Sequence, residues 1–118
     1  MRSVLIVDDH ALFRSRARQL LERDGFRVVG EAGDGDSALN AARALRPQVV
    51  LLDVQLPGED GFAVCHRILA EGEGMAVVLT SGRPEASFRR RLANSRAIGF
   101  IAKADLTPGA LAAVLEAD

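Results

Sequence analysis

Three carboxylates in this sequence follow runs of apolar residues. Asp8 and Asp9 come directly after SVLIV, and Asp53 ends the run VVLLD. Such runs are typical of strands buried on both faces. A carboxylate at the end of one must lie at the rim of the sheet, because an unpaired buried charge is very costly. Three carboxylates at one rim repel one another unless a cation joins them or one takes up a proton. Surroundings rich in oxygen and without histidine ligands favour a hard ion such as Mg²⁺.

One ammonium group and two hydroxyl groups follow the last two apolar runs. Thr80 and Ser81 end the run AVVLTS, and Lys103, the only lysine in the chain, follows IGFIA. A lysine binds an anion as a compact point charge, and a hydroxyl can donate to a phosphoryl oxygen. Together with a metal ion held by carboxylates, these groups are what phosphoryl transfer onto a carboxylate requires. Asp53 is the candidate acceptor, because it ends the middle strand and the other groups flank it.

The sequence alternates between short apolar runs and amphipathic segments, which predicts the elements that position these groups. We expect strands over residues 3–7, 26–32, 49–53, 76–80 and 98–102, and helices over about 11–23, 37–45, 61–70, 84–94 and from 107 onward. Strands joined by crossover helices are parallel, and the helices cover both faces of the sheet. The carboxyl ends of parallel strands meet at one edge, where ligands bind in such sheets. The chemical groups therefore gather at one edge of an α/β fold.

Composition limits the class of protein. The chain has 118 residues, with 15 basic and 16 acidic side chains, and 48% of it is hydrophobic. This length predicts a single domain over residues 1–118, and the balanced charge argues against direct nucleic-acid binding. The single cysteine, Cys65, excludes an internal disulfide and fits a reducing compartment. No apolar run is long enough to cross a membrane, so we expect a cytoplasmic protein without membrane contact.

The joint pattern resembles a response regulator receiver domain of two-component systems. It consists of DD after the first strand, D…PG..G from Asp53 to Gly61, a Thr or Ser after the fourth strand, and GF-x-x-K from Gly99 to Lys103. The pattern covers essentially the whole chain, and its order and spacing are far more specific than any one motif. The resemblance implies a flavodoxin-like, doubly wound parallel sheet of strand order 2-1-3-4-5 with five helices. It also implies that a sensor histidine kinase phosphorylates Asp53.

The resemblance further implies a role for each charged residue of the pattern. The side chains of Asp9 and Asp53 and the backbone carbonyl of Gln55 would bind Mg²⁺, and Asp8 would bind the ion through water. Lys103 would contact the phosphoryl group.

A hydroxyl and an aromatic side chain would respond to phosphorylation. We expect Thr80 to be the switch hydroxyl, because the strand pattern places it at the strand tip. Ser81 is the alternative, since counting back from Lys103 without a gap arrives at that residue. Phe100 would be the aromatic residue whose rotation reports phosphorylation.

The chain departs from the commonest receiver pattern after the lysine. Many receivers carry proline where this chain has Ala104, which leaves the geometry of the Lys103–Ala104 peptide open. The stretch KADL is instead similar to receivers attached to helix-turn-helix outputs of the LuxR type. We expect control of transcription through an attached or partner output, with a stand-alone single-domain regulator as the alternative.

A homodimer through the fourth helix, fifth strand and fifth helix is a further implication of the resemblance. The arginine-rich segment 88–92 would lie on that surface, although it fits a solvated helix face equally well.

Two other functions fit the sequence less well. Phosphatases of the haloacid dehalogenase type also use an aspartate at a strand end, but their second acid falls where this chain has Gln55, which cannot donate a proton in that way. A nucleotide-binding flavodoxin-like domain would have a glycine-rich loop where this chain has DDHALF, whose acids repel phosphate. We therefore expect no enzyme beyond self-phosphorylation and its reversal.

His10 and His66 are expected to be surface or packing residues, since histidine metal sites need more than one histidine at suitable spacing.

Overall fold

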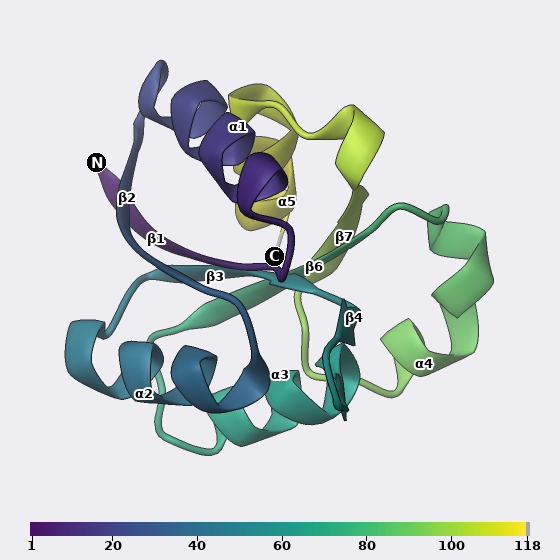
Figure 1. The fold of residues 1–118 in the computed structure, drawn as a ribbon. Coiled ribbons are helices and arrows are strands. Elements are labelled where there is room, and N and C mark those ends of the chain that lie inside the picture. Colours follow the sequence, from purple (N-terminus) through teal and green to yellow (C-terminus); the bar gives the residue numbers. More distant parts are fainter. Residues whose placement is uncertain (118) are drawn as a thin grey trace.

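A computed structural model describes residues 1–117 and contains a five-stranded parallel sheet (Figure 1). Its strands are β1 (Arg2–Val7), β2 (Phe26–Ala32), β3 (Val49–Asp53), β6 (Ala76–Ser81) and β7 (Gly99–Ala102). They lie in the order β2-β1-β3-β6-β7, and every neighbouring pair is parallel. Because β4 and β5 form a separate ladder, this is the order 2-1-3-4-5. The predicted flavodoxin-like, doubly wound architecture is confirmed.

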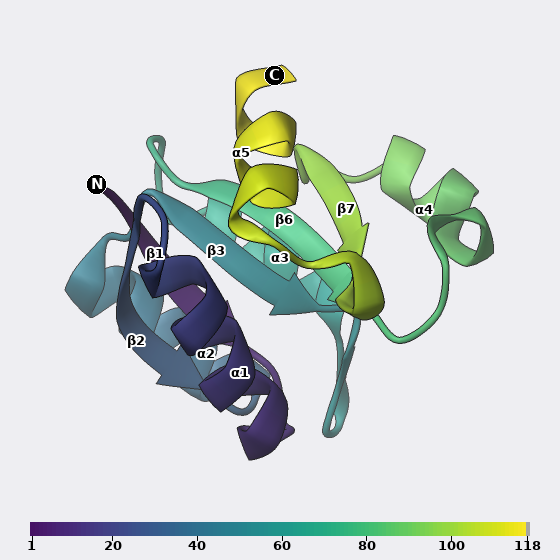
Figure 2. The ribbon, with the colours of Figure 1, turned by 90° about the horizontal axis from the view of Figure 1, so that it is seen from above.

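Helices cover both faces of the sheet. α1 (Ala11–Glu22) and α5 (Pro108–Ala117) lie on one face, and α2 (Gly35–Leu45) and α3 (Gly61–Leu69) lie on the other (Figures 1 and 2). The short α4 (Arg89–Ala93) lies near the β7 edge. Among residues 1–117, no helix has the length and apolar character needed to span a membrane.

The central strands supply two hydrophobic cores, because their side chains alternate between the faces of the sheet. In β3, Leu51 packs in the core beneath α1 and α5, whereas Leu52 packs in the core against α2 and α3. In β6 and β7, Leu79 and Phe100 belong to the α2–α3 core, and Val78 belongs to the opposite one. This alternation fixes the face toward which each residue at the strand ends points.

The segment between β6 and β7 differs from the single helix expected over residues 84–94. Glu85–Phe88 form a 3₁₀ turn, and only Arg89–Ala93 are α-helical. Pro84 is extended, at φ −72° and ψ 159°, and precedes the turn instead of lying within it. Phe88 leaves helical geometry, and its buried ring packs against Phe100 with 5.8 Å between ring centroids. The expectation is wrong in its first half, because packing of this ring overrides the local helical pattern.

The residues between β3 and α3 form a small ladder of two short strands. β4 (Gln55–Leu56) and β5 (Glu59–Asp60) pair in antiparallel fashion. Gly61 follows at once, and its N–H donates to the carbonyl oxygen of Val54 at 2.6 Å. A Cβ at this glycine would lie 2.2 Å from the carbonyl oxygen of Asp53. Only glycine allows α3 to begin so close to the end of β3.

Candidate functional site

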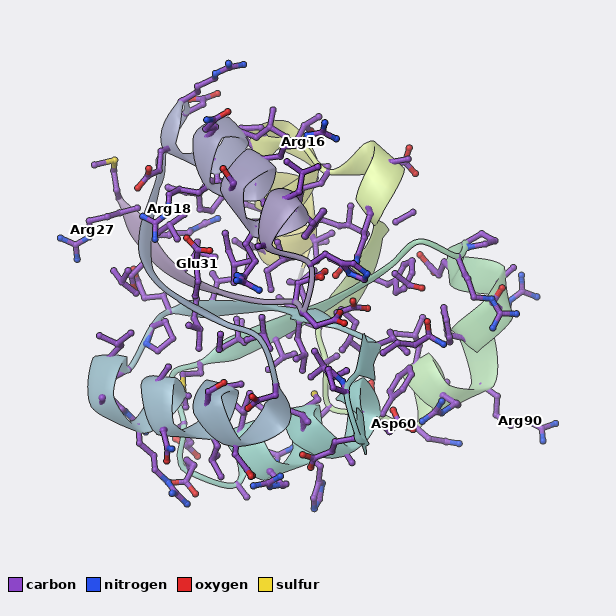
Figure 3. All side chains as sticks on the ribbon, in the orientation of Figure 1. Arg16, Arg18, Arg27, Glu31, Asp60 and Arg90 are labelled. Atoms are coloured by element: carbon purple, nitrogen blue, oxygen red, sulfur yellow. The ribbon has the colours of Figure 1, made fainter. Side chains whose placement is uncertain are left out.

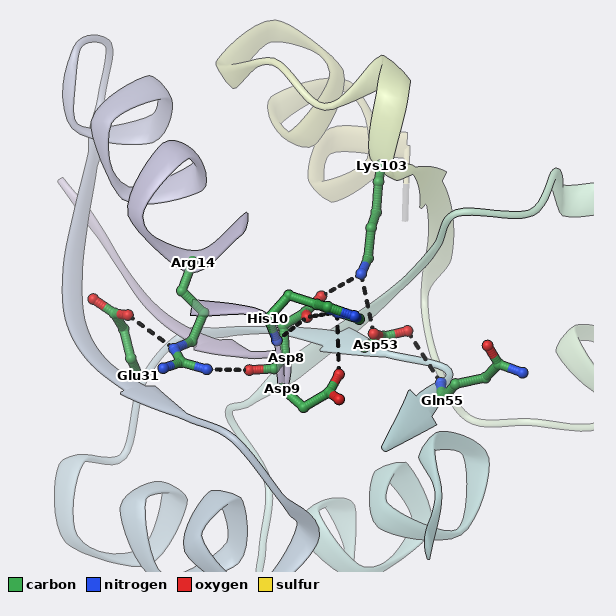
Figure 4. Close-up of polar contacts among 8 residues, drawn as sticks. All are labelled: Asp8, Asp9, His10, Arg14, Glu31, Asp53, Gln55 and Lys103. Atoms are coloured by element: carbon green, nitrogen blue, oxygen red, sulfur yellow. Dashed lines mark hydrogen bonds and ion pairs between the residues drawn. The ribbon is translucent and has the colours of Figure 1, made fainter. Parts of the chain in front are cut away.

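The carboxyl ends of β1, β3 and β7 bring Asp8, Asp53 and Lys103 into direct contact (Figure 4). Lys103 Nζ lies 2.6 Å from Asp8 Oδ2 and 3.1 Å from Asp53 Oδ2. Asp9 contributes a third carboxylate to the same group. Residues far apart in the sequence therefore gather at one sheet edge, where the strand order places them.

Asp8 is fixed by groups from three elements. Its backbone N–H donates to the carbonyl oxygen of Ala32 at 3.0 Å, which joins the end of β1 to β2. Arg14 of α1 donates from Nη1 to the carbonyl oxygen of Asp8 at 2.5 Å, and its Nε is held by Glu31 Oε1 at 3.0 Å. The buried carboxylate of Asp8 accepts the backbone N–H of His10 at 2.8 Å. These contacts leave the Asp8 side chain little freedom to turn away from the cluster.

Lys103 is aimed at the carboxylates by its surroundings. It begins a 3₁₀ turn (Lys103–Asp105) directly after β7, and the Lys103–Ala104 peptide is trans. Its side chain is only 20% exposed, and Nζ lies 4.7 Å from the ring centroid of Phe13 in α1. An aromatic face attracts a cation, so the ring of Phe13 stabilises the ammonium at this position.

Burial and mutual repulsion shift the pKa values of these groups. Burial raises the pKa of Asp53 and the charge of Asp8 adds to this, although the N–H of Gln55 and the ammonium of Lys103 act in the opposite direction. Burial opposes ionisation of Asp8, but hydrogen bonds from Lys103 and His10 outweigh it and lower the pKa of Asp8. Burial likewise opposes the charge of Lys103, yet its two carboxylate contacts raise the pKa of the ammonium. One ammonium thus serves two buried carboxylates, which leaves negative charge uncompensated.

The donor set fits a divalent cation. Ligand atoms of Asp8, Asp9, His10 and Asp53 all lie within 4.8 Å of one another. Asp9, His10 and Asp53 border a cleft of about 400 Å³, whose lining is completed by Gln55, Leu56, Pro57, Gly82 and Lys103, while the Asp8 side chain is fully buried. Several carboxylate oxygens with room for water are the surroundings that Mg²⁺ prefers, so the residues present can hold such an ion.

His10 lies in this group, although its sequence pattern predicts only a surface or packing residue. Its side chain is 66% exposed, as expected for a surface residue, but Nδ1 lies 2.9 Å from Asp8 Oδ1 and 3.1 Å from Asp9 Oδ1. The available signal was its place directly after the acid pair, at the residue before α1 begins. His66, the other histidine, lies on the exposed side of α3, as expected.

The two hydroxyls at the end of β6 point to opposite faces of the sheet. Both residues are buried, and the backbone of Thr80 lies beside Asp53 in the β3–β6 register. Because side chains alternate, Ser81 shares a face with Leu79 and with Phe100 of β7, whereas Thr80 faces the α1–α5 side. Ser81 Oγ accepts the backbone N–H of Arg83 at 3.0 Å.

Comparison with known proteins identifies the family to which this fold and its acidic edge belong. The chain belongs to the response regulator receiver domain family, whose model matches residues 4–116. It is 41% identical to the transcription regulator BvgA of Bordetella pertussis over 100 residues, which cover 85% of this chain and 48% of that protein. It is 39% identical to the response regulator GacA of Pseudomonas syringae pv. syringae over 104 residues, 87% of this chain and 49% of that protein. The chain thus spans about half the length of the curated relatives it matches.

Solved structures of receiver domains have the same fold. The signal receiver domain of the response regulator NarL from Mycobacterium tuberculosis superposes with a TM-score of 0.85 and 36% identity, over 98% of this chain and 94% of that one. A two-component response regulator of the LuxR family from Aurantimonas sp. SI85-9A1 superposes with a TM-score of 0.86 and 28% identity, over 99% of this chain and 84% of that one. The resemblance to receivers of LuxR-type regulators is therefore confirmed.

Neutralising Asp53 is expected to stabilise the protein when divalent cations are absent. The raised pKa of Asp53 means that its ionised form is disfavoured in the folded state. Asp53→Asn should raise the free energy of unfolding by about 1 kcal/mol or more at neutral pH, since like charges in contact repel by ~1–4 kcal/mol. The gain should vanish as the pH falls below about 3.9, where the carboxyl is protonated even in the unfolded chain. Urea unfolding in EDTA at several pH values measures it.

Asp36→Asn is the matched control for this measurement, because the Asp36 side chain is 88% exposed and its only ion pair within residues 1–117 is with Arg67 on the surface. It should change the free energy of unfolding by less than about 0.5 kcal/mol. A loss of stability in Asp53→Asn at neutral pH would mean that the ion pair with Lys103 outweighs the repulsion.

Proposed function

We propose that the chain is a phosphorylation-dependent signalling switch, which accepts a phosphoryl group on Asp53 from a sensor histidine kinase in a Mg²⁺-dependent reaction. The observation that carries this proposal is the contact of Lys103 Nζ with both Asp53 and Asp8 at the mouth of an acidic cleft. An ammonium already placed beside the acceptor oxygen can meet the phosphoryl oxygens as they arrive. Membership of the receiver family supports the kinase as donor.

Each residue of the cluster has a role in this proposal. The side chains of Asp9 and Asp53 and the backbone carbonyl of Gln55 would hold Mg²⁺, with Asp8 holding it through water. The bound ion would neutralise the charge of the carboxylates and of the incoming phosphoryl group. A carboxylate oxygen of Asp53 attacks phosphorus in line, so that a P–O bond forms while the P–N bond to the kinase histidine breaks. Lys103 stabilises the charge on the transferred oxygens.

A hydroxyl of β6 and the ring of Phe100 would carry the signal away from Asp53. The first expectation was Thr80, and the shared face of Ser81 and Phe100 now favours Ser81 as the switch hydroxyl. Drawing this hydroxyl toward the phosphoryl group would free space beside Phe100, whose ring now packs on Phe88 at 5.8 Å. Movement of Phe88 would in turn shift the adjoining α4, which biases the surface formed by α4, β7 and α5.

The output and the partners belong to the same proposal. BvgA is named a transcription regulator and is about twice as long as the matched region, so we propose that this domain controls transcription through an attached or partner output. A stand-alone regulator is the alternative.

A homodimer through α4, β7 and α5 would use exposed residues such as Arg90, whose side chain points away from the body of the protein (Figure 3). A cytoplasmic location and the absence of turnover on any external substrate are also proposed.

Acetyl phosphate, a small phosphodonor, tests the acceptor chemistry without a kinase. With Mg²⁺ the intact mass should increase by about 80 Da, the mass of one phosphoryl group. Without divalent cation, or in Asp53→Asn, no increase is expected. Asp105→Asn, which removes an exposed acid two residues after Lys103, should be phosphorylated like the unaltered protein. An increase that does not require Mg²⁺ would contradict the proposal.

A further inference from the structure

The imidazole of His10 lies over the acidic cluster at the mouth of the cleft (Figure 4). Its Nδ1 is 2.9 Å from Asp8 Oδ1 and 3.1 Å from Asp9 Oδ1. It is one of the four residues whose ligand atoms all fall within 4.8 Å of one another, and the only one of them that offers nitrogen. The ring therefore belongs to the same cation-binding group as the carboxylates.

The backbone of His10 holds the ring in this place. The residue is extended, at φ −92° and ψ 105°, and it precedes the first turn of α1. Its N–H donates to Asp8 Oδ1 at 2.8 Å, so main chain and ring contact the same carboxylate. The side chain makes no capping hydrogen bond to α1, so helix capping does not explain where the ring lies.

We propose that His10 Nδ1 is a metal ligand and that it makes this site selective for borderline divalent transition ions such as Co²⁺ over Mg²⁺. The inference rests on the proposed function, because the site is the same. Imidazole nitrogen binds first-row transition ions well, whereas Mg²⁺ prefers oxygen ligands. A neutral imidazole with its hydrogen on Nε2 presents a lone pair at Nδ1, which already points at the carboxylates that would share the ion.

The competing explanation is that His10 only holds Asp8 in place through the two contacts to Oδ1. In that case its removal would weaken the binding of every divalent cation by a similar factor, since each uses the same carboxylates. A nitrogen ligand predicts a different result, because only ions with affinity for nitrogen would lose a bond. The ratio of two metal affinities separates the two explanations.

Calorimetric titration of the purified chain with CoCl₂ and with MgCl₂, at one fixed pH and without phosphodonor, measures this ratio. His10→Asn should lower the affinity for Co²⁺ about tenfold or more, the scale of losing one metal-site contact, and should change the affinity for Mg²⁺ less than about twofold. Asparagine is favoured before a helix, so α1 should remain intact. His66→Asn, which alters the other histidine, should change neither affinity. Equal losses for both ions, or no loss for Co²⁺, would overturn the inference.

A spectroscopic readout is independent of affinity. In proton NMR spectra of the Co²⁺ complex, a metal–nitrogen bond would pass unpaired spin density to the His10 ring, so its exchangeable Nε2–H resonance should be shifted far outside the diamagnetic range and should be missing in His10→Asn. A Co²⁺ complex without such a shifted exchangeable resonance would contradict ligation by His10.

Failure of this inference is distinguishable from failure of the proposed function. If Mg²⁺ and acetyl phosphate modify Asp53 while the Co²⁺ to Mg²⁺ affinity ratio is unchanged in His10→Asn, the selectivity is refuted and the switch stands. If the ratio falls in His10→Asn but Asp53 is never modified, the metal site is supported and the switch is refuted.

Discussion

Replacement of Lys103 by methionine is expected to slow phosphorylation by acetyl phosphate about a hundredfold or more at saturating Mg²⁺. Removal of one group that stabilises transition-state charge typically costs ~10²–10³ in rate. The chain has no other lysine, and Lys103 Nζ contacts both Asp8 and Asp53, so no neighbouring ammonium can replace it. Methionine keeps the length of the stem without its charge. The rate of increase in intact mass measures the effect.

Arg27→Met is the matched control, since it removes an exposed cation of β2 whose side chain points away from the body of the protein (Figure 3). Its rate should stay within about twofold of that of the unaltered protein. Thermal unfolding of both variants checks that they are folded. An unchanged rate in a folded Lys103→Met protein would show that the ammonium contributes only to the resting structure.

Gly61→Ala is expected to lower the free energy of unfolding by about 3 kcal/mol or more. The added Cβ would lie 2.2 Å from the carbonyl oxygen of Asp53 and 2.6 Å from Cα of Val54. Both are backbone atoms, so the clash cannot be relieved by a change of rotamer, and overpacking of this kind costs ~1–3 kcal/mol or more. The midpoint of thermal unfolding should fall by roughly 10 °C. Because Asp53 must shift with its own carbonyl, phosphorylation should slow as well.

Gly109→Ala serves as its control. A Cβ there would meet nothing closer than Thr107 Oγ1 at 3.9 Å, and Gly109 lies in the first turn of α5, where alanine is the better helix former. Its stability should be unchanged or higher by up to about 1 kcal/mol. If Gly61→Ala were as stable as Gly109→Ala, the close approach of α3 to the end of β3 would not be a constraint on this site.

The parallel arrangement of the strands could be predicted from the sequence pattern because each step is strongly constrained, whereas their order was implied only by the resemblance to receiver domains. VVLLD is apolar on both faces, and β3 is in fact buried along its whole length. Crossover helices force such strands to be parallel, and parallel strands deliver their carboxyl ends to one edge. These rules place Lys103 and Asp53 at the same edge of the sheet, although neither residue gives a strong signal alone.

The features that sequence could not predict depend on contacts between distant residues. Arg91 of α4 forms an ion pair with Asp60 and stacks over Phe62, with 4.2 Å from its guanidinium carbon to the ring centroid. Together with the buried ring of Phe88, these contacts fix how the segment before β7 folds, and local helical patterning carries no information about them. The choice between Thr80 and Ser81 likewise depends on the residue at which β6 ends, and the structure extends this strand to Ser81.

The place of His10 in the carboxylate cluster could not be predicted from the sequence for a different reason. Histidine metal sites are usually recognised by two or more histidines at a regular spacing, and this chain has two histidines far apart. A single histidine that joins a carboxylate cluster has no such spacing. Its position is determined by the turn between β1 and α1, which only the structure describes.

Chemical mapping of the phosphoryl group tests the central claim most directly. Borohydride reduces an aspartyl phosphate to homoserine, so the acceptor can be read from tryptic peptides after treatment with acetyl phosphate and Mg²⁺. Asp8 and Asp9 lie on the peptide of residues 3–14, and Asp53 lies on the peptide of residues 44–67. We predict homoserine at residue 53 only, identified by fragmentation of the second peptide. Homoserine at Asp8 or Asp9, or at no aspartate in a protein that has gained the mass of a phosphoryl group, would contradict the assignment of Asp53 as the acceptor.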